Sequence, residues 1–117
     1  MQKLSSYGAN QISKVLANNK TVKRVRLDKF NFRDVGAISI AEALKKNTSI
    51  TDLSMNSNSI ADQGAIAIAE ALKKNRSLRT LRLIYNPIAN DGAIAIGKAL
   101  QNVVILLVQL KNFRTTD

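Results

Sequence analysis

The hydrophobic and polar positions of the chain repeat with a period of 28 residues. Gly36, Gly64 and Gly92 each open the same motif, Gly-Ala-Ile-x-Ile, and a leucine follows each glycine eight residues later. Self-similarity at a fixed period is the signature of a repeat architecture. The register predicts three full repeats between an N-terminal half repeat or cap helix and a terminal strand with a tail. Their bounds are 1–20, 21–48, 49–76, 77–104 and 105–117.

Each repeat combines two patterns. The first spaces three apolar residues as in Leu78, Leu81 and Leu83, which predicts a short strand with one buried face. The second spaces apolar residues as in Gly64, Ile68 and Leu72, which predicts a helix with one buried stripe. A strand followed by a helix in every repeat indicates parallel strands.

The unequal widths of strands and helices predict curvature. Strands stack about 4.8 Å apart, whereas helices are about 10–12 Å across. We therefore expect one α/β domain over residues 1–117, a short right-handed arc with parallel strands on the concave side and helices on the convex side. The alanine-rich helices, as at 65–71, would let neighbouring helices approach closely.

Polar residues mark the predicted helix ends. Asp34, Asp62 and Asn90 stand two residues before the repeat glycines, where we expect N-caps that accept bonds from free backbone N–H groups. Asn47 and Asn75 follow the last helical turn, where we expect a left-handed backbone.

Several motifs of the chain resemble those of a known family. Residues 81–88 (LRLIYNPI), followed by Asp91-Gly92-Ala93 and Ala99-Leu100, resemble leucine-rich repeats. The 28-residue period and the helix motif resemble the ribonuclease-inhibitor-like subclass, which includes NOD-like receptors and the Ran GTPase-activating protein. The resemblance implies a leucine-rich-repeat solenoid that binds proteins on its concave face.

The resemblance also implies a role for one asparagine in each repeat. In the family, an Asn after the strand bonds backbone groups of the turn, and Asn58 and Asn86 match that position. Phe30 and Phe113 replace it near the two ends. We expect Phe to fill the turn with apolar surface there.

Composition argues against catalysis. The chain has no Cys and no His, so it lacks thiolate nucleophiles and the commonest metal ligand and proton-transfer group. No GxGxxG or GxxxxGK[ST] motif occurs. We therefore expect no enzyme, no metal and no cofactor.

Membrane and targeting signals are missing as well. The longest apolar run, residues 103–108, is far shorter than the roughly 20 residues of a membrane-spanning helix. The start of the chain has no apolar run of signal-peptide length. The sequence predicts a cytoplasmic protein.

The strand residues that point away from the core form the predicted partner-binding face. With 18 Lys and Arg against 8 Asp and Glu, the formal charge is 18 − 8 = +10, so we expect a protein partner with an acidic surface. The alternative is an ordinary solvated sheet face. The candidate residues are Arg24, Arg26, Asp28, Asp52, Ser54, Asn56, Thr80, Arg82, Ile84, Tyr85, Gln109 and Lys111, with Leu107 also placed on this face.

A second set of cations lies at the helix ends, as a lysine-rich rim formed by Lys45, Lys46, Lys73 and Lys74. This rim allows electrostatic binding of nucleic acid or anionic membrane. Cations at helix C-termini also complement the helix macrodipole, and Glu42 and Glu70 stand at pairing distance along the helices. The second interpretation is favoured, so nucleic acid and membrane are not the expected partners.

The C-terminal edge is apolar. Val104, Leu106, Leu107 and Val108 would form a strand with no helix to cover it, and such edges favour association. Three explanations stay open. The chain is part of a longer array, or it forms a homodimer through this edge, or Phe113 and residues 114–117 fold back as a cap.

Overall fold

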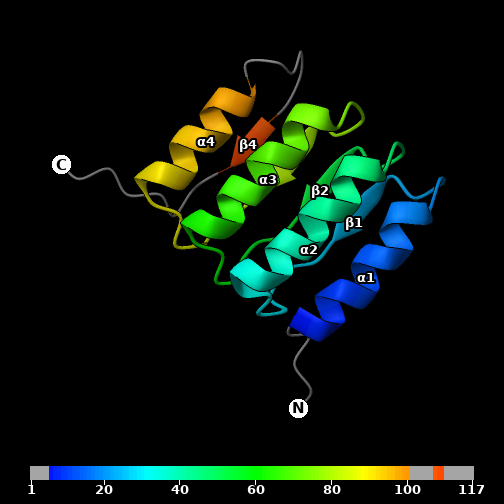
Figure 1. The fold of residues 1–117 in the computed structure, drawn as a ribbon, viewed down its shortest axis with the longest axis horizontal. Coiled ribbons are helices and arrows are strands. Elements are labelled where there is room, and N and C mark those ends of the chain that lie inside the picture. Colours follow the sequence, from blue (N-terminus) through cyan, green and yellow to red (C-terminus); the bar gives the residue numbers. More distant parts are fainter. Residues whose placement is uncertain (1–5, 101–106, 110–117) are drawn as a thin grey trace.

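The computed structural model describes residues 6–100 and 107–109. Within these residues, helices and strands alternate along the chain (Figure 1). Their bounds are α1 Ser6–Asn18, β1 Arg24–Arg26, α2 Arg33–Lys46, β2 Asp52–Ser54, α3 Asp62–Lys74, β3 Thr80–Arg82, α4 Asn90–Leu100 and β4 Leu107–Gln109.

The strands form one parallel sheet in the order β1-β2-β3-β4, as predicted. Val25 pairs with Leu53, Leu53 with Leu81, and Leu81 with Val108. The last step is 27 residues rather than 28. Val108 therefore occupies the position of Val25, Leu53 and Leu81, with one residue fewer in the last step than in the others.

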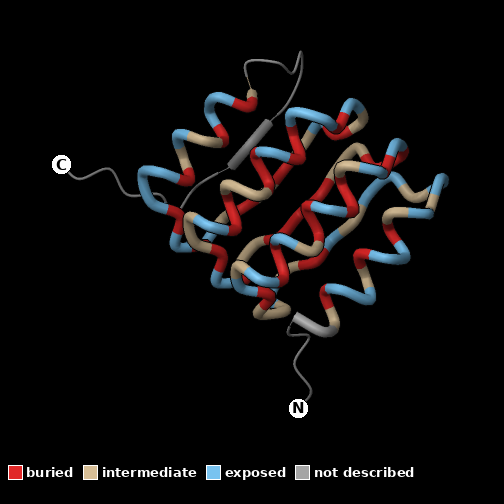
Figure 2. Tube along the Cα trace, in the orientation of Figure 1, coloured by how far each residue is buried: buried red, intermediate tan, exposed pale blue. Residues whose placement is uncertain are grey.

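The helices form one layer and the strands the other (Figure 1). The chain is an α/β repeat solenoid, with the strands on the concave side and the helices on the convex side. Figure 2 shows buried residues recurring along the four helices and along β2 and β3. Successive repeats contribute equivalent residues to one core, with Leu53 and Leu81 from the strands and Ile40, Ile68 and Ile96 from the helices. Burial of each such side chain contributes about 1.5–3 kcal/mol.

The repeat glycines let adjacent helices approach. A Cβ atom on Gly64 would lie 2.8 Å from Asp34 Oδ1 and 3.0 Å from the Ala37 Cβ atom. Gly92 meets Asp62 and Ala65 in the same way, at 2.8 and 2.9 Å. The predicted close approach of helices therefore depends on these glycines as much as on alanine.

The predicted aspartate N-caps are wrong. Asp34 and Asp62 lie inside the first turns of α2 and α3, and neither of these helices has a side-chain cap. Instead, Asp34 Oδ1 accepts a hydrogen bond from the Ala61 N–H at 2.7 Å, and Asp62 Oδ1 accepts one from the Ala89 N–H at 2.7 Å. The helices begin earlier than the pattern predicted, which aims each carboxylate at the next repeat. Asn90 is the first residue of α4 rather than a residue before it.

The predicted left-handed backbone after α2 and α3 is also wrong. Asn47 has φ −74° and ψ 140°, and Asn75 has φ −76° and ψ 136°, so both are extended. The buried Asn47 side chain donates to the carbonyls of Leu16 (2.8 Å) and Asn19 (3.0 Å). Its Oδ1 accepts from the backbone N–H groups of Ser49 (2.8 Å) and Ile50 (2.7 Å). Asn75 repeats all four bonds one repeat later.

A second asparagine series, at the ends of the strands, confirms the role that the family resemblance implied. Asn58 Oδ1 accepts from the N–H groups of Phe30 (2.9 Å) and Phe32 (3.3 Å) in the preceding repeat. Asn86 Oδ1 accepts from Asn58 (2.9 Å) and Ile60 (3.0 Å). We call all these side-chain-to-backbone bonds between repeats, including those of Asp34 and Asp62, the inter-repeat ladders.

The asparagine series ends at Phe30 in an apolar contact. The Phe30 ring packs against the core with its centroid 5.5 Å from that of Phe32. This matches the apolar filling that was predicted for Phe at this position. Phe113 lies outside the described residues.

Candidate interaction surface

The strand register builds the predicted concave face. One row across the sheet contains Arg24, Asp52 and Thr80, and the next contains Arg26, Ser54 and Arg82. Arg26 and Arg82 therefore share a row with Ser54 between them. Through β4, Leu107 and Gln109 continue the two rows. Lys111 lies outside the described residues.

An open hollow of about 540 Å³ lies on this face. Its lining residues are Arg24, Val25, Arg26, Asp52, Ser54 and Arg82. Arg24 and Arg26 are exposed and Arg82 is half-buried. Three guanidinium groups thus surround a shallow depression with a single carboxylate, Asp52, whose Oδ1 accepts a bond from the Thr51 hydroxyl at 2.9 Å.

Three of the predicted surface residues are engaged within the chain. Ser54 is only 3% exposed, and its hydroxyl donates to Asp28 Oδ1 at 2.6 Å. Asp28 Oδ1 also accepts from the Asn56 N–H at 2.8 Å, and Asn56 Oδ1 accepts from the Ile84 N–H at 2.8 Å. Asp28 and Asn56 therefore act as one more inter-repeat ladder. Ser54 is buried because it sits under this carboxylate, contrary to the expectation of an exposed position.

Beyond the arginine row lies an exposed aromatic side chain. Tyr85 is 58% exposed and has a left-handed backbone, with φ 63°. A bulky residue in this region is uncommon and costs on the order of 1–3 kcal/mol. Ile84, next to it, is half-buried. Thr80, in the outer row, is also half-buried and uncharged.

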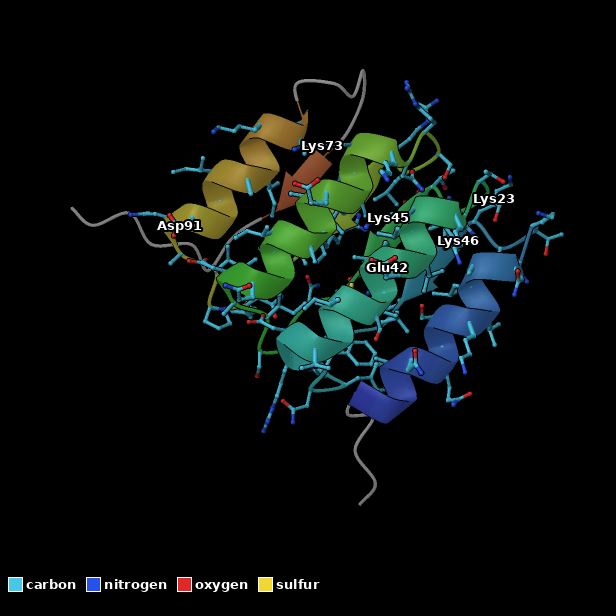
Figure 3. The ribbon with its side chains drawn as sticks, in the orientation of Figure 1. Lys23, Glu42, Lys45, Lys46, Lys73 and Asp91 are labelled. Atoms are coloured by element: carbon cyan, nitrogen blue, oxygen red, sulfur yellow. The ribbon has the colours of Figure 1, made fainter. Side chains whose placement is uncertain are left out.

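The lysine-rich rim is partly neutralised, as predicted. Lys45 pairs with Glu42 at 3.1 Å and Lys73 pairs with Glu70 at 3.3 Å. Lys46 and Lys74 are exposed. In Figure 3 the labelled lysines gather toward the edge where α2 and α3 end, and Asp91 lies toward the opposite edge.

Sequence reasoning missed two cations of this region. Lys23 and Arg79 are both exposed and lie in equivalent positions just before β1 and β3. The signal that could have found them is a three-residue spacing from Lys20 through Lys23 to Arg26, repeated from Arg76 through Arg79 to Arg82.

Within residues 6–100 and 107–109, no group of three His, Cys, Asp or Glu side chains could hold a metal ion. None of the helices in the described part of the chain is long and apolar enough to cross a membrane. Of the predicted self-association edge, Leu107 and Val108 belong to β4, whereas Val104 and Leu106 lie outside the described residues.

Solved structures with the same architecture include a leiomodin structure and a tropomodulin domain. A structure titled "Leiomodin-1 Actin-Binding Site 2 (ABS2)" has 26% sequence identity and a TM-score of 0.84, and the match covers 99% of this chain and 70% of that one. The tropomodulin C-terminal domain of Caenorhabditis elegans has 17% identity and a TM-score of 0.78, covering 96% of this chain and 67% of that one. The second match shows the fold alone.

Sequence comparison identifies leucine-rich repeats in the chain. No curated protein matches the sequence. The family model described as "Leucine Rich repeat" matches residues 46–69 and 74–97, which lie in the region where the 28-residue period is clearest. With the parallel-strand solenoid and its asparagine series, these matches show that the chain is a leucine-rich repeat protein.

Proposed function

We propose that this chain is a non-enzymatic protein-interaction module that binds a partner with an acidic surface on its concave face. The observation that carries the proposal is the arginine-lined hollow over β1, β2 and β3. Arg24 and Arg26 are exposed, and a guanidinium group can bind a carboxylate through two parallel hydrogen bonds. Tyr85, exposed beside this row, belongs to a residue type enriched at interaction hot spots.

Actin is the partner that we propose to test first. The leiomodin-1 structure that matches 99% of this chain is titled as an actin-binding site. A cytoplasmic location belongs to this proposal, because actin would be met there. The 28-residue period also supports placing the chain in the ribonuclease-inhibitor-like subclass.

Co-sedimentation with actin filaments tests the proposal. We expect the natural chain to pellet with the filaments and Arg26→Glu with Arg82→Glu to weaken the affinity by about tenfold or more, because two attractive charges become repulsive. The matched control is Lys14→Glu with Lys98→Glu, which makes the same change in net charge at exposed positions of α1 and α4. Thermal unfolding of each variant confirms that it folds.

Each outcome has a meaning. A natural chain that does not pellet removes actin as the partner. Equal binding by the natural chain and the Arg26→Glu, Arg82→Glu variant overturns the concave face as the binding site. An equal loss in the control means that net charge, rather than this face, determines binding.

We also propose self-association through the β4 edge. Among the described residues no strand follows β4, which pairs with β3 alone. An exposed strand edge is a template for pairing with another chain. Light scattering behind a sizing column should give a mass that rises above 12.8 kDa with protein concentration. A constant mass of one chain across concentrations would refute this edge as a contact between copies.

A further inference from the structure

Two columns of cations flank a strip of small hydroxyl residues on the strand side of the molecule. Within each column and within the strip, successive residues are three positions apart in the sequence. Equivalent residues of the first column, the strip and the second column are 28 positions apart. The first column is Lys20, Lys23 and Arg26, the strip is Thr48, Thr51 and Ser54, and the second column is Arg76, Arg79 and Arg82.

Backbone hydrogen bonds hold the three series level with one another. The Thr51 N–H donates to the Lys23 carbonyl at 2.7 Å, and the Arg79 N–H donates to the Thr51 carbonyl at 2.7 Å. Strand pairing aligns Arg26 with Ser54 and Ser54 with Arg82.

Asparagine side chains align the first residue of each series, namely Lys20, Thr48 and Arg76. The Asn47 side chain donates to the Asn19 carbonyl at 3.0 Å, and the Asn75 side chain donates to the Asn47 carbonyl at 3.1 Å. Lys20, Thr48 and Arg76 directly follow these asparagines, so they too lie side by side.

The surface is hollowed at both ends of the strip. One hollow, of about 170 Å³, is lined by Thr48 and Arg76 together with Lys45, Lys74 and neighbouring residues. The other is the concave hollow of about 540 Å³, which Arg26, Ser54 and Arg82 line. Thr51 lies between the two, with Lys23 and Arg79 on either side. We call the strip and its two columns, from the helix ends to the concave face, the trough.

The width of the trough suits one extended chain. Neighbouring strands lie about 4.8 Å apart, so the backbones of the two columns are about 10 Å apart. The strip between them contains only Thr and Ser. Two carboxylates stand beside the strip, because the Ser54 hydroxyl donates to Asp28 and the Thr51 hydroxyl to Asp52, and the two columns set six cations against them.

Helix electrostatics does not account for four of the six column cations, because only Lys20 and Arg76 stand within two residues of a helix end. All six cations lie outside the helices, and Lys23 and Arg79 each stand five residues beyond a helix end. The macrodipole acts only within about one turn. Among the described residues, the one carboxylate within ion-pairing distance of these cations is Asp28, 3.4 Å from Arg26, whose side chain is 76% exposed. The columns therefore keep their charge available to a ligand.

We propose that the trough binds an extended acidic peptide segment, with its carboxylates directed to the two columns and its main chain over the threonine strip. This inference rests on the proposed function, because the trough enters the concave face. Single-stranded nucleic acid fits less well, since its binding uses aromatic rings as stacking platforms. Neither the columns nor the strip contains an aromatic residue, and Phe30 and Phe32 lie in the strand-to-helix turn.

Fluorescence anisotropy with a labelled ten-residue glutamate peptide tests the trough. We expect binding that weakens steeply with salt, and a loss of about tenfold or more in three variants. These are Lys20→Glu with Arg76→Glu, Lys23→Glu with Arg79→Glu, and Arg26→Glu with Arg82→Glu. Thr51→Phe, which fills the floor without changing charge, should also weaken binding. The control is again Lys14→Glu with Lys98→Glu.

The outcomes separate the trough from the concave site. Loss only in the Arg26→Glu, Arg82→Glu variant overturns the trough and leaves the concave site intact. An equal loss in the control, or no binding by the natural chain, also overturns the trough. A labelled oligothymidine that binds more tightly than the peptide, and is weakened by the same variants, would make nucleic acid the occupant. Actin co-sedimentation, measured separately, decides whether the proposed function stands.

Discussion

The inter-repeat ladders and the cation columns use polar side chains in opposite ways. Every ladder residue is bonded to backbone of a neighbouring repeat, as Asn47 is to Leu16 and Asn19. The column cations instead project from loops and strands, and five of the six are exposed. The ladder residues recur every 28 residues and the column cations every 56, which is twice the same period, so periodicity alone does not separate structural from functional residues. The two kinds of residue are separated by whether their side chains are hydrogen-bonded to the backbone of a neighbouring repeat.

The largest effect should come from breaking a ladder. Asn47→Ala leaves two carbonyls and two N–H groups without their partner in a buried site, and we expect it to lower the free energy of unfolding by about 3 kcal/mol. For a chain of this size the melting temperature should fall by roughly 12 °C. Chemical denaturation followed by circular dichroism measures the loss.

Two further variants sharpen that result. Asn47→Asp keeps the two accepting bonds but turns a carboxylate oxygen toward the carbonyls of Leu16 and Asn19 in a buried site, so it should cost at least as much as Asn47→Ala. Lys46→Ala, at the adjacent exposed position, should change stability by less than about 0.5 kcal/mol. Equal effects of Asn47→Ala and Lys46→Ala would contradict the structural role of the ladder.

Alanine substitutions at two glycines test the contact between helices. We expect them to change the free energy of unfolding in opposite directions, by less than Asn47→Ala does. Gly64→Ala would place a methyl group 2.8 Å from both Asp34 Oδ1 and Ile60 Cγ2, and we expect a loss of about 1–3 kcal/mol. Gly97→Ala meets nothing within 4 Å on α4, and should stabilise the chain by about 1 kcal/mol through helix propensity. Thermal unfolding of the two variants gives the comparison. If Gly64→Ala were as stable as Gly97→Ala, the close approach of α2 and α3 would be wrong.

The sequence predicted the parts of the fold that depend on burial and period. Leu53 and Leu81, which belong to the repeated strand pattern, occupy the core as that pattern indicates. The partner of each polar group was harder to predict. Asp34 reaches Ala61 rather than its own helix because the helix begins earlier than the pattern indicates, and no local pattern fixes that boundary.

The candidate site was predicted in the same uneven way. The row from Arg26 to Arg82 follows from strand alternation, and the structure places it as expected. The burial of Ser54 depends on a carboxylate 26 residues away, which no single repeat reveals. Lys23 and Arg79 were missed because they precede the regular strands. Only the loop hydrogen bonds through Thr51 show that the two residues lie on either side of Thr51.

The uniform spacing of the contacts between repeats has a consequence for folding kinetics. Each helix contacts only its neighbours along the chain, and the ladder bonds join residues 26–31 positions apart. Closing a loop of that length costs about 3 kcal/mol of chain entropy apart from a constant, and the cost is the same for every repeat. Nucleation can therefore begin at any adjacent pair of repeats, and the structure can propagate to either end in equal steps.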